Sequence, residues 1–401
     1  MAGINFKYES LQRLRIKIGL LINPFYIYCL TFSLAILVYS WGWSALFPKL
    51  SLSLLLFFGL SFIIFIYAGY IFGKRYTPVT NSEFPHLFLN DFMFGLIILL
   101  GVINIILMGY LPILDRSRNY REFGIPVIDP LFNTLSIFFS VIFLQSFLCI
   151  RKKRYLFYLI VILLFQVLLF RRSTIIWILM SSSFLLLYLY QRINIMIILG
   201  FLICIPLFSF CFGLYGNIRS NLTKSFVLND LGASESFKKA GLGHNHYMTY
   251  LYISSPLANL QKNINESSVS SSDIKSFFLF NVIPESVTLR LNKTLPLKSP
   301  DCFLITPDLI VGTFLMVSFC TLGWTGMILM LFFLFFSIHL CLFLIRKFET
   351  FQVTTFCILS TAVSLLIFSN FLNRLDVIIM LFIYPVIFHF IYSDKQKEIS
   401  G

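Results

Sequence analysis

Apolar residues fill the chain in runs of about 20, the length that one α-helix needs to cross the hydrocarbon core of a bilayer. Each run is continuous and rich in Leu, Ile and Phe, whereas strands of a membrane barrel alternate over about ten residues. Because a bilayer leaves no water for unpaired backbone groups, the pattern predicts an all-α, polytopic helical bundle with about ten transmembrane helices. The expected crossings run roughly from Leu20 to Trp43, Leu50 to Phe72, Leu87 to Leu111, Pro130 to Ile150, Tyr155 to Phe170, Thr174 to Tyr190, Ile193 to Tyr215, Trp324 to Ile345, Phe351 to Leu372 and Leu375 to Tyr392.

One long polar stretch, residues 216–301, interrupts this pattern, and function is expected to lie there. The apolar run Phe303 to Cys320 follows it, and counting that run as a crossing would place Arg346 and Lys347 outside. We therefore expect the run to be an interfacial or re-entrant helix that closes the large loop. The predicted organisation is a membrane bundle of about seven helices over 1–215, a large periplasmic loop domain with short or interfacial helices over 216–323, and C-terminal transmembrane helices with a cytoplasmic tail over 324–401.

Composition excludes a soluble globular protein. The chain is 58% hydrophobic and only 12% charged, with a mean hydropathy of +0.87. Its net charge of +14 is spread over the loops, which favours membrane topology and contact with anionic headgroups over nucleic-acid binding. Basic residues of short loops stay in the cytoplasm, so both termini are expected there and the large loop outside, which is the periplasm if the cell is a Gram-negative bacterium. The residues that fix this orientation are Lys7, Arg13, Arg15, Lys17, Lys74, Arg75, Arg151, Lys152, Lys153, Arg154, Arg192, Arg346, Lys347, Lys395 and Lys397.

The cysteines give no sign of a cross-linked or metal-binding domain. Eight are present without paired spacing, and only Cys302 falls clearly in the large loop. We expect neither a disulfide framework nor a metal site. Because the chain also lacks a phosphate-binding glycine loop, an ATPase is excluded, and no cofactor is predicted.

Four arginines are candidates for anion binding. Arg171 and Arg172 stand opposite the basic run 151–154, against the positive-inside trend. A guanidinium pair at the mouth of a helix bundle is costly unless it binds something, and arginine holds phosphate oxygens through paired hydrogen bonds. The alternative is that both side chains extend to lipid headgroups. In the large loop, Arg219 and Arg290 could converge on the same anion or form part of a solvated surface.

The large loop also carries a histidine pair followed by three tyrosines. A histidine near neutral pH can take a proton from a hydroxyl, so His244 or His246 could act as a general base. Structural or substrate hydrogen bonding is the alternative, while a metal site is disfavoured because no cysteine or carboxylate cluster accompanies the pair. Tyr247, Tyr250 and Tyr252 could either pack in a core or offer rings to sugars.

Three short segments carry a family resemblance. Phe170 to Thr174 places two arginines at the start of a predicted helix, Tyr252 to Leu260 contains Tyr-x-x-Ser-Pro, and Gly312 to Gly326 is a glycine-bearing helix entry. With the overall topology, these resemble Wzy-type O-antigen polymerases, the oligosaccharide repeat-unit polymerases of Gram-negative bacteria. An acidic residue common in the third segment is Leu322 here. His244-Asn245 resembles a pair in the related O-antigen ligases, although the glycine expected to end that motif is Ser255.

This resemblance implies a GT-C-like inner-membrane glycosyltransferase of lipopolysaccharide biosynthesis, without metal or cofactor. It would move a glycan from its undecaprenyl-diphosphate carrier onto a new lipid-linked repeat unit at the periplasmic face. The four arginines would stabilise the departing diphosphate, His246 or His244 would serve as base with Glu285 in reserve, and the three tyrosines would contact sugar. Expected partners are the lipid-linked oligosaccharide, membrane lipid and a chain-length regulator. The alternatives are an O-antigen ligase and a flippase or other transporter of lipid-linked oligosaccharides.

Overall fold

The structure is a computed structural model that describes residues 23–75, 87–115, 122–190, 206–207, 209–217, 223–266, 274–294, 300–346 and 351–391. Within these ranges the chain is helical and forms no strand, which confirms the predicted all-α class. Extended backbone pairs there only through an antiparallel bridge between Ser44 and Ala233.

The long helices follow the predicted apolar runs, and shorter ones fill the polar stretch. The α-helices are α2 (Pro24–Tyr39), α3 (Leu52–Arg75), α4 (Leu87–Met108), α5 (Ile128–Ile150), α6 (Lys153–Leu168), α7 (Arg172–Tyr190), α9 (Glu235–Lys239), α10 (His244–Asn265), α11 (Ile274–Phe277), α12 (Glu285–Thr294), α13 (Met316–Ile345), α14 (Gln352–Ser364) and α15 (Leu375–Ile378). Short π-helical segments are η2 (Phe226–Asp230), η3 (Phe278–Val282) and η7 (Ile379–Ile383). Short 3-10 helices are η5 (Leu365–Ile367) and η6 (Phe371–Asn373).

The chain divides into two compact units, each assembled from separate stretches of sequence. Unit 1 comprises Met1–Arg75, Gln191–Ser337 and Val363–Arg374, and unit 2 comprises Tyr76–Tyr190, Ile338–Ala362 and Leu375–Gly401. The large loop therefore shares a unit with α2 and α3.

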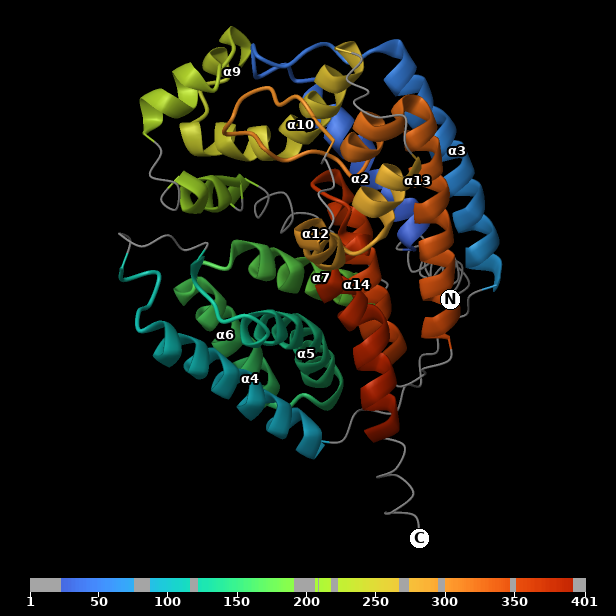
Figure 1. Ribbon diagram of the computed structural model, residues 1–401. Coiled ribbons are helices and arrows are strands. Elements are labelled where there is room, and N and C mark those ends of the chain that lie inside the picture. Colours follow the sequence, from blue (N-terminus) through green and yellow to red (C-terminus); the bar gives the residue numbers. More distant parts are fainter. Residues whose placement is uncertain are drawn as a thin grey trace, which may run out of the picture. The chain divides into compact units, whose positions relative to one another are not determined.

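In unit 1, α2 packs against α3 and α10 (Figure 1). Asn23 caps α2 by accepting a hydrogen bond from the Tyr26 N–H at 3.0 Å, and Pro24 stands in the first turn, where its missing N–H costs nothing. Aromatic rings join α2 to α3, with Tyr28 and Phe65 centroids 4.3 Å apart. The aromatic-rich sequence thus supplies the packing between these two helices.

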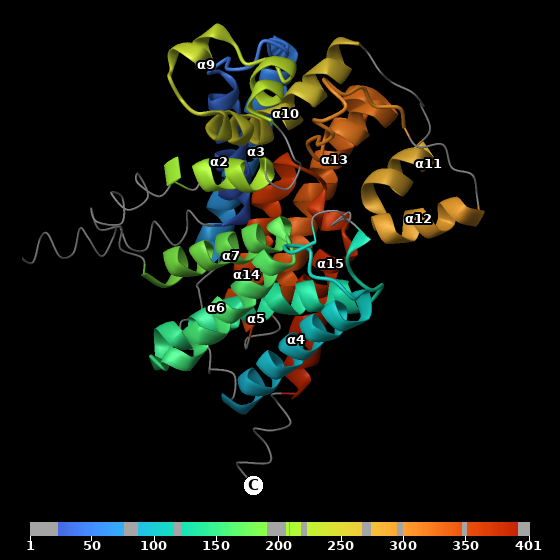
Figure 2. The same cartoon turned by 90° about the vertical axis from the view of Figure 1, so that its left-hand side faces the viewer.

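In unit 2, α5 is the central helix, and α4, α6 and α7 run beside it (Figure 2). Its apolar residues are distributed all round the helix, and most of its side chains are buried, as expected for a helix surrounded by protein. The polar residues of its first turns then lie inside the unit, where they need hydrogen-bond partners.

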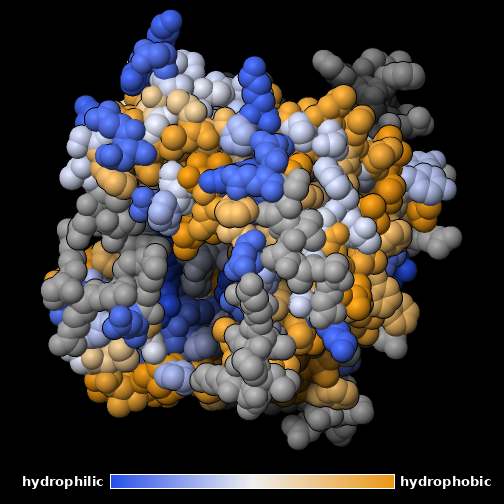
Figure 3. Space-filling view, turned by 45° about the horizontal axis from the view of Figure 1, so that its top comes forward, coloured by the Kyte–Doolittle hydropathy of each residue, from blue (hydrophilic) through white to orange (hydrophobic). Residues whose placement is uncertain are grey.

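Helix α3 shows how the apolar surface is used. Phe58 and Phe65 are buried, whereas Leu60 and Ile63 on its other side are 64% and 67% exposed. Apolar side chains likewise cover much of the surface seen in Figure 3. A helix that is apolar on both its packed and its exposed side suits lipid. Among the described residues, five helices are long and apolar enough to cross a membrane, which indicates a membrane-embedded protein: Leu52–Gly73, Leu89–Met108, Ile128–Ile150, Arg172–Leu189 and Met316–Ile345.

One predicted crossing falls largely outside the described residues, and one predicted helix differs from the structure. The predicted crossing Ile193 to Tyr215 lies largely outside the described residues. The expected re-entrant helix over Phe303 to Cys320 was wrong, because residues 301–315 are irregular and α13 starts only at Met316. Gly323 (φ 61°) kinks α13 and separates its first two turns from the predicted Trp324 to Ile345 crossing.

The expectation that no disulfide forms was also wrong. Cys302 and Cys320 are joined, with Cα atoms 5.8 Å apart. The apolar run predicts a helix that ends at Cys320, but the irregular segment 301–315 brings Cys302 and Cys320 together. This segment, called the strap below, is held against α10.

Candidate functional site

The predicted arginine pair lies in unit 2, at the turn between α6 and α7. We call the surrounding group the arginine corner; its members are Phe123, Asp129, Asn133, Arg171, Arg172 and Thr174. Helix α6 ends in a turn in which the N–H of Arg171 donates to the carbonyl of Gln166 at 2.9 Å, and that of Phe170 to Val167 at 3.1 Å. This pair of hydrogen bonds closes a helix C-terminus, and the residue in the position of Phe170 is normally glycine. Here Phe170 takes the left-handed conformation at φ 54°.

Arg171 is engaged on two sides. Its Nη2 lies 2.8 Å from Asp129 Oδ1 and also donates to the carbonyl of Phe123. The guanidinium further stands 5.8 Å from the centre of the Phe123 ring. Both ion-pair partners are largely enclosed, at 22% and 13% side-chain exposure. Arg171 is therefore an internal partner of Asp129, which sequence reasoning did not pair with it.

A hydrogen-bond chain extends from this ion pair into α7. Asn133 Nδ2 donates to Asp129 Oδ2 at 3.1 Å, and Thr174 Oγ1 donates to Asn133 Oδ1 at 3.3 Å. Asp129 and Asn133 are four residues apart on α5 and so face the same way. The chain fixes the first turn of α7 to the first turn of α5.

Strained backbone surrounds the corner. Val127 has φ 75° and Phe170 has φ 54°, both uncommon for residues with a bulky side chain. Gly124, at φ 123°, lies so close that a Cβ atom there would stand 2.6 Å from Asp129 Cγ and 2.8 Å from Arg171 Nη2. Residues held this way cost about 1–3 kcal/mol each and gather at functional sites.

The corner also contains polar atoms that the described protein leaves unmatched. Gln166 is fully buried and belongs to the stripe of α6 that faces inward, yet neither its Oε1 nor its Nε2 has a hydrogen-bond partner among the described residues. The same holds for Nε of Arg171. Buried polar atoms without a protein partner point to a ligand, an ion or water.

Arg172 is the first residue of α7 and is half-buried. The first N–H groups of a helix have no partner within it and carry the positive end of its dipole. A guanidinium at this position adds a full charge to a terminus that already favours anions.

In unit 1, the histidine pair lies at the start of α10. His244 is its first residue, and His246 is half-buried with Nδ1 3.1 Å from Ser209 Oγ. Between them, the buried Asn245 accepts a hydrogen bond from Asn217 Nδ2 at 2.8 Å. The segment 209–217 thus positions the His246 ring, whose second nitrogen could serve in proton transfer.

Two of the three tyrosines belong to the core. Tyr247 is fully buried and its hydroxyl donates to the Leu231 carbonyl at 2.7 Å, while Tyr250 is 2% exposed and packs 5.3 Å from Trp43. Neither ring can stack on a sugar, so core packing is the correct reading for both. Tyr252 is half-buried and lies edge-on to Phe212 at 5.3 Å.

Helix α12 carries the remaining described candidates. Glu285 is its first residue, and both Glu285 and Arg290 are exposed. Neither forms an ion pair with another described residue. Arg219 lies outside the described residues.

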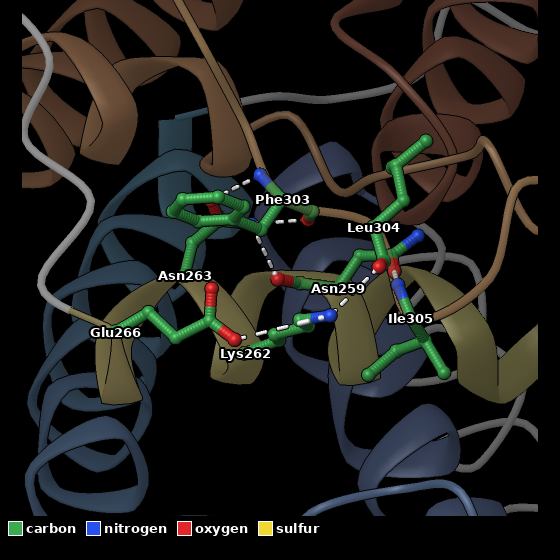
Figure 4. A network of polar contacts seen from close by, with 7 residues as sticks. All are labelled: Asn259, Lys262, Asn263, Glu266, Phe303, Leu304 and Ile305. Atoms are coloured by element: carbon green, nitrogen blue, oxygen red, sulfur yellow. Dashed lines mark hydrogen bonds and ion pairs between the residues drawn. The ribbon is translucent and has the colours of Figure 1, made fainter.

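Polar side chains of α10 hold the strap through a network of hydrogen bonds (Figure 4). The sequence did not predict this network. Asn259 Nδ2 donates to the carbonyls of Leu309 at 2.6 Å and Val311 at 2.8 Å, and its Oδ1 accepts from the Ile305 N–H at 2.8 Å. One turn later, Asn263 exchanges two 2.8 Å hydrogen bonds with the backbone of Phe303. Helix α10 therefore supplies the backbone partners that the irregular strap lacks.

The predicted site residues are divided between the units. Arg171 and Arg172 belong to unit 2, whereas His244, His246, Tyr252, Glu285 and Arg290 belong to unit 1. The described residues hold no cluster of three or more metal-ligating side chains. Comparison of the chain with known protein families, curated proteins and solved structures found no match.

Proposed function

We propose that this protein is a membrane-embedded glycosyltransferase that polymerises lipid-linked repeat units of a surface polysaccharide, the O-antigen. The observation that carries the proposal is the placement of Arg172 at the first residue of α7, beside an arginine that Asp129 already neutralises. A diphosphate is the substrate group that such a helix terminus favours. The apolar helices provide the bilayer setting that a polyprenyl diphosphate requires.

The proposed topology has about ten crossings of the inner membrane, both termini in the cytoplasm and the large loop in the periplasm. The Cys302–Cys320 disulfide supports this orientation, because disulfides persist on the oxidising side of a bacterial membrane.

The proposed reaction needs an anion-stabilising group and a base. A hydroxyl oxygen of the acceptor sugar attacks the anomeric carbon of the donor, and the bond from that carbon to the undecaprenyl diphosphate breaks. The candidates for the anion-stabilising group are Arg172 in unit 2 and Arg290 and Arg219 in unit 1, because a guanidinium stabilises the charge that develops on the departing diphosphate. The candidates for the base that accepts the hydroxyl proton are His246, which Ser209 orients, His244 and Glu285.

Arg171, Tyr247 and Tyr250 have no direct role in this proposal. Arg171 is committed to Asp129 and Phe123, and the two tyrosines are buried. Tyr252 remains the candidate for sugar contact.

The test is reconstitution of the purified protein in liposomes with a defined undecaprenyl-diphosphate-linked repeat unit, without ATP or added metal. A ladder of lengthened lipid-linked glycans is the expected result. Transfer only onto a lipid A core acceptor would identify a ligase instead. Movement of unextended substrate between leaflets would identify a flippase.

Arg172→Ala should lower the turnover number by about 10²- to 10³-fold, as expected for removal of a donor aimed at developing charge. Arg172→Lys should fall in between, because lysine keeps the charge without the planar fork. Arg151→Gly is the control, since Arg151 is exposed and its φ of 60° suits glycine. Wild-type polymerisation by Arg172→Ala would remove the diphosphate site from this corner.

A further inference from the structure

We propose that Asp129 is a positioning residue for the diphosphate site, and that the two neighbouring arginines divide their tasks. Arg171 is the internal strut that Asp129 holds, and Arg172 is the residue that contacts the diphosphate. This inference rests on the proposed function and adds to it a residue outside the family resemblance. Its basis is the arrangement around the Asp129–Arg171 ion pair.

The Asp129–Arg171 ion pair sets the charge that a ligand meets at the arginine corner. Asp129 lies 2.8 Å from Arg171, so the pair is close to neutral as seen from outside the corner. An approaching dianion then meets the positive charge of Arg172 and the amide end of α7. Two adjacent charged arginines would offer the dianion competing positions, whereas neutralising Arg171 directs it to Arg172.

Contacts of Arg171 and Asp129 also hold the first turn of α7 in place. Arg171 also donates to the Phe123 carbonyl, and Gly124 packs against both members of the ion pair with no space for a side chain. Asn133 and Thr174 continue the hydrogen bonds from Asp129 to the third residue of α7. Asp129 therefore joins the loop before α5 to the turn that begins α7, and Arg172 lies between Arg171 and Thr174 in that turn.

Unit 2 contains a second described ion pair, between Arg154 and Asp91. Arg154 Nη1 lies 2.9 Å from Asp91 Oδ2, but these side chains are 38% and 37% exposed. They join the starts of α4 and α6, whereas the arginine corner lies at the end of α6. The Arg154–Asp91 ion pair therefore serves as a control, because it has the same chemistry but lies where we expect no diphosphate.

The experiment uses the reconstituted full-length protein with the lipid-linked repeat unit as substrate. Asp129→Asn should lower kcat/KM for the donor by roughly 10- to 100-fold, because small displacements of a contacting group have effects of that size. Asp91→Asn should retain kcat/KM within about two-fold, since exposed ion pairs contribute little. Binding of farnesyl diphosphate to the purified proteins provides a readout that does not require turnover, and it should weaken in Asp129→Asn but not in Asp91→Asn.

A double variant protects the test against simple unfolding. Asp129→Asn with Arg171→Gln removes both charges together and leaves no uncompensated charge behind. If Asp129 acts by positioning, this variant keeps the wild-type thermal midpoint but still loses at least 10-fold in kcat/KM and in farnesyl diphosphate affinity. Asp129→Glu, which keeps the carboxylate, should recover part of the loss.

The outcomes separate this inference from the proposed function. Wild-type kcat/KM and affinity in the double variant, with Arg172→Ala inactive, would overturn the positioning role alone. If Arg172→Ala also binds farnesyl diphosphate and polymerises as wild type, the site itself is elsewhere and both proposals fail.

Discussion

The strap on α10 and the arginine corner are both polar networks within helical units, but they are built from different chemistry. The strap is held mainly by neutral asparagine amides, with one further bond from the charged Lys262 Nζ to the Leu304 carbonyl at 2.9 Å, and Asn259 uses both N–H groups and its oxygen on backbone partners. The corner is built on a charged pair, and its buried neighbour Gln166 has no partner for either polar atom among the described residues.

Scaffold and site in a protein of this kind differ in how their buried polar groups are satisfied. An asparagine amide whose hydrogen bonds are all made satisfies the backbone and adds stability, but it offers nothing to a ligand. A charged network with strained backbone and unmatched polar atoms costs stability and is retained where it binds something. Variants at each network should therefore move different observables, stability for the strap and substrate handling for the corner.

The largest expected effect on stability is that of Asn259→Asp. The aspartate can still accept from the Ile305 N–H, but its second oxygen would face the carbonyls of Leu309 and Val311, which then lose their donor. Leaving two buried carbonyls unmatched should lower the free energy of unfolding by about 3 kcal/mol or more. Thermal unfolding in detergent and protease resistance of the loop region measure it.

Asn265→Asp is the matched control, because Asn265 is exposed at the end of the same helix and only accepts a hydrogen bond from Gln261. Its effect should stay within about 0.5 kcal/mol. Equal losses in the two variants would show that the strap does not depend on the Asn259 amide.

A smaller effect is expected from opening the disulfide that closes the strap. Cys302→Ser removes a cross-link between residues 18 apart and should cost about 2 to 3 kcal/mol. Non-reducing gels after maleimide labelling report the bond, with the exposed Cys149 as the reactive reference. Ready labelling of both Cys302 and Cys320 in unreduced protein would contradict it.

How far the sequence could predict the fold depends on periodicity. The long apolar runs identified helices such as α3 and α4 closely, because membrane length and continuity are strong signals. The strap was missed because Phe303 to Cys320 is apolar enough for a helix, and its irregular backbone depends on Asn259 and Asn263, some 40 residues earlier. Partners that distant leave no mark on local periodicity.

The candidate site was predictable in part. The unusual location of Arg171 and Arg172 drew attention to this turn, but the sequence could not show that Asp129 engages one of them across a separation of 42 residues. Tyr247 and Tyr250 were equally suited to a core or to a sugar surface, and only their packing with Trp43 and Phe237 decides it.

Tyr247→Phe tests the neutral hydrogen bonds of α10 outside the strap and should cost about 1 kcal/mol, the value of one lost hydrogen bond to the Leu231 carbonyl. Burial raises the pKa of Tyr247 above its ordinary value near 10. The unfolded chain therefore loses this proton first, and stability should fall as pH rises above about 10. Tyr247→Phe should lose less stability over that range in alkaline unfolding curves, and an unchanged pH dependence would assign the effect to other groups.

The smallest expected effect on stability comes from the double variant Asp129→Asn with Arg171→Gln, the one expected to impair substrate handling. Replacing both members of an enclosed ion pair avoids an uncompensated charge, and the attraction lost is offset by the desolvation that the charges no longer require. The free energy of unfolding should change by no more than about 1 kcal/mol, well below the change in Asn259→Asp. A loss as large as that of Asn259→Asp would make the corner a structural element and erase the contrast between the two networks. A small loss would mean that the strained turns at Val127 and Phe170 are kept for what Arg172 binds, because the ion pair they enclose contributes little to the fold.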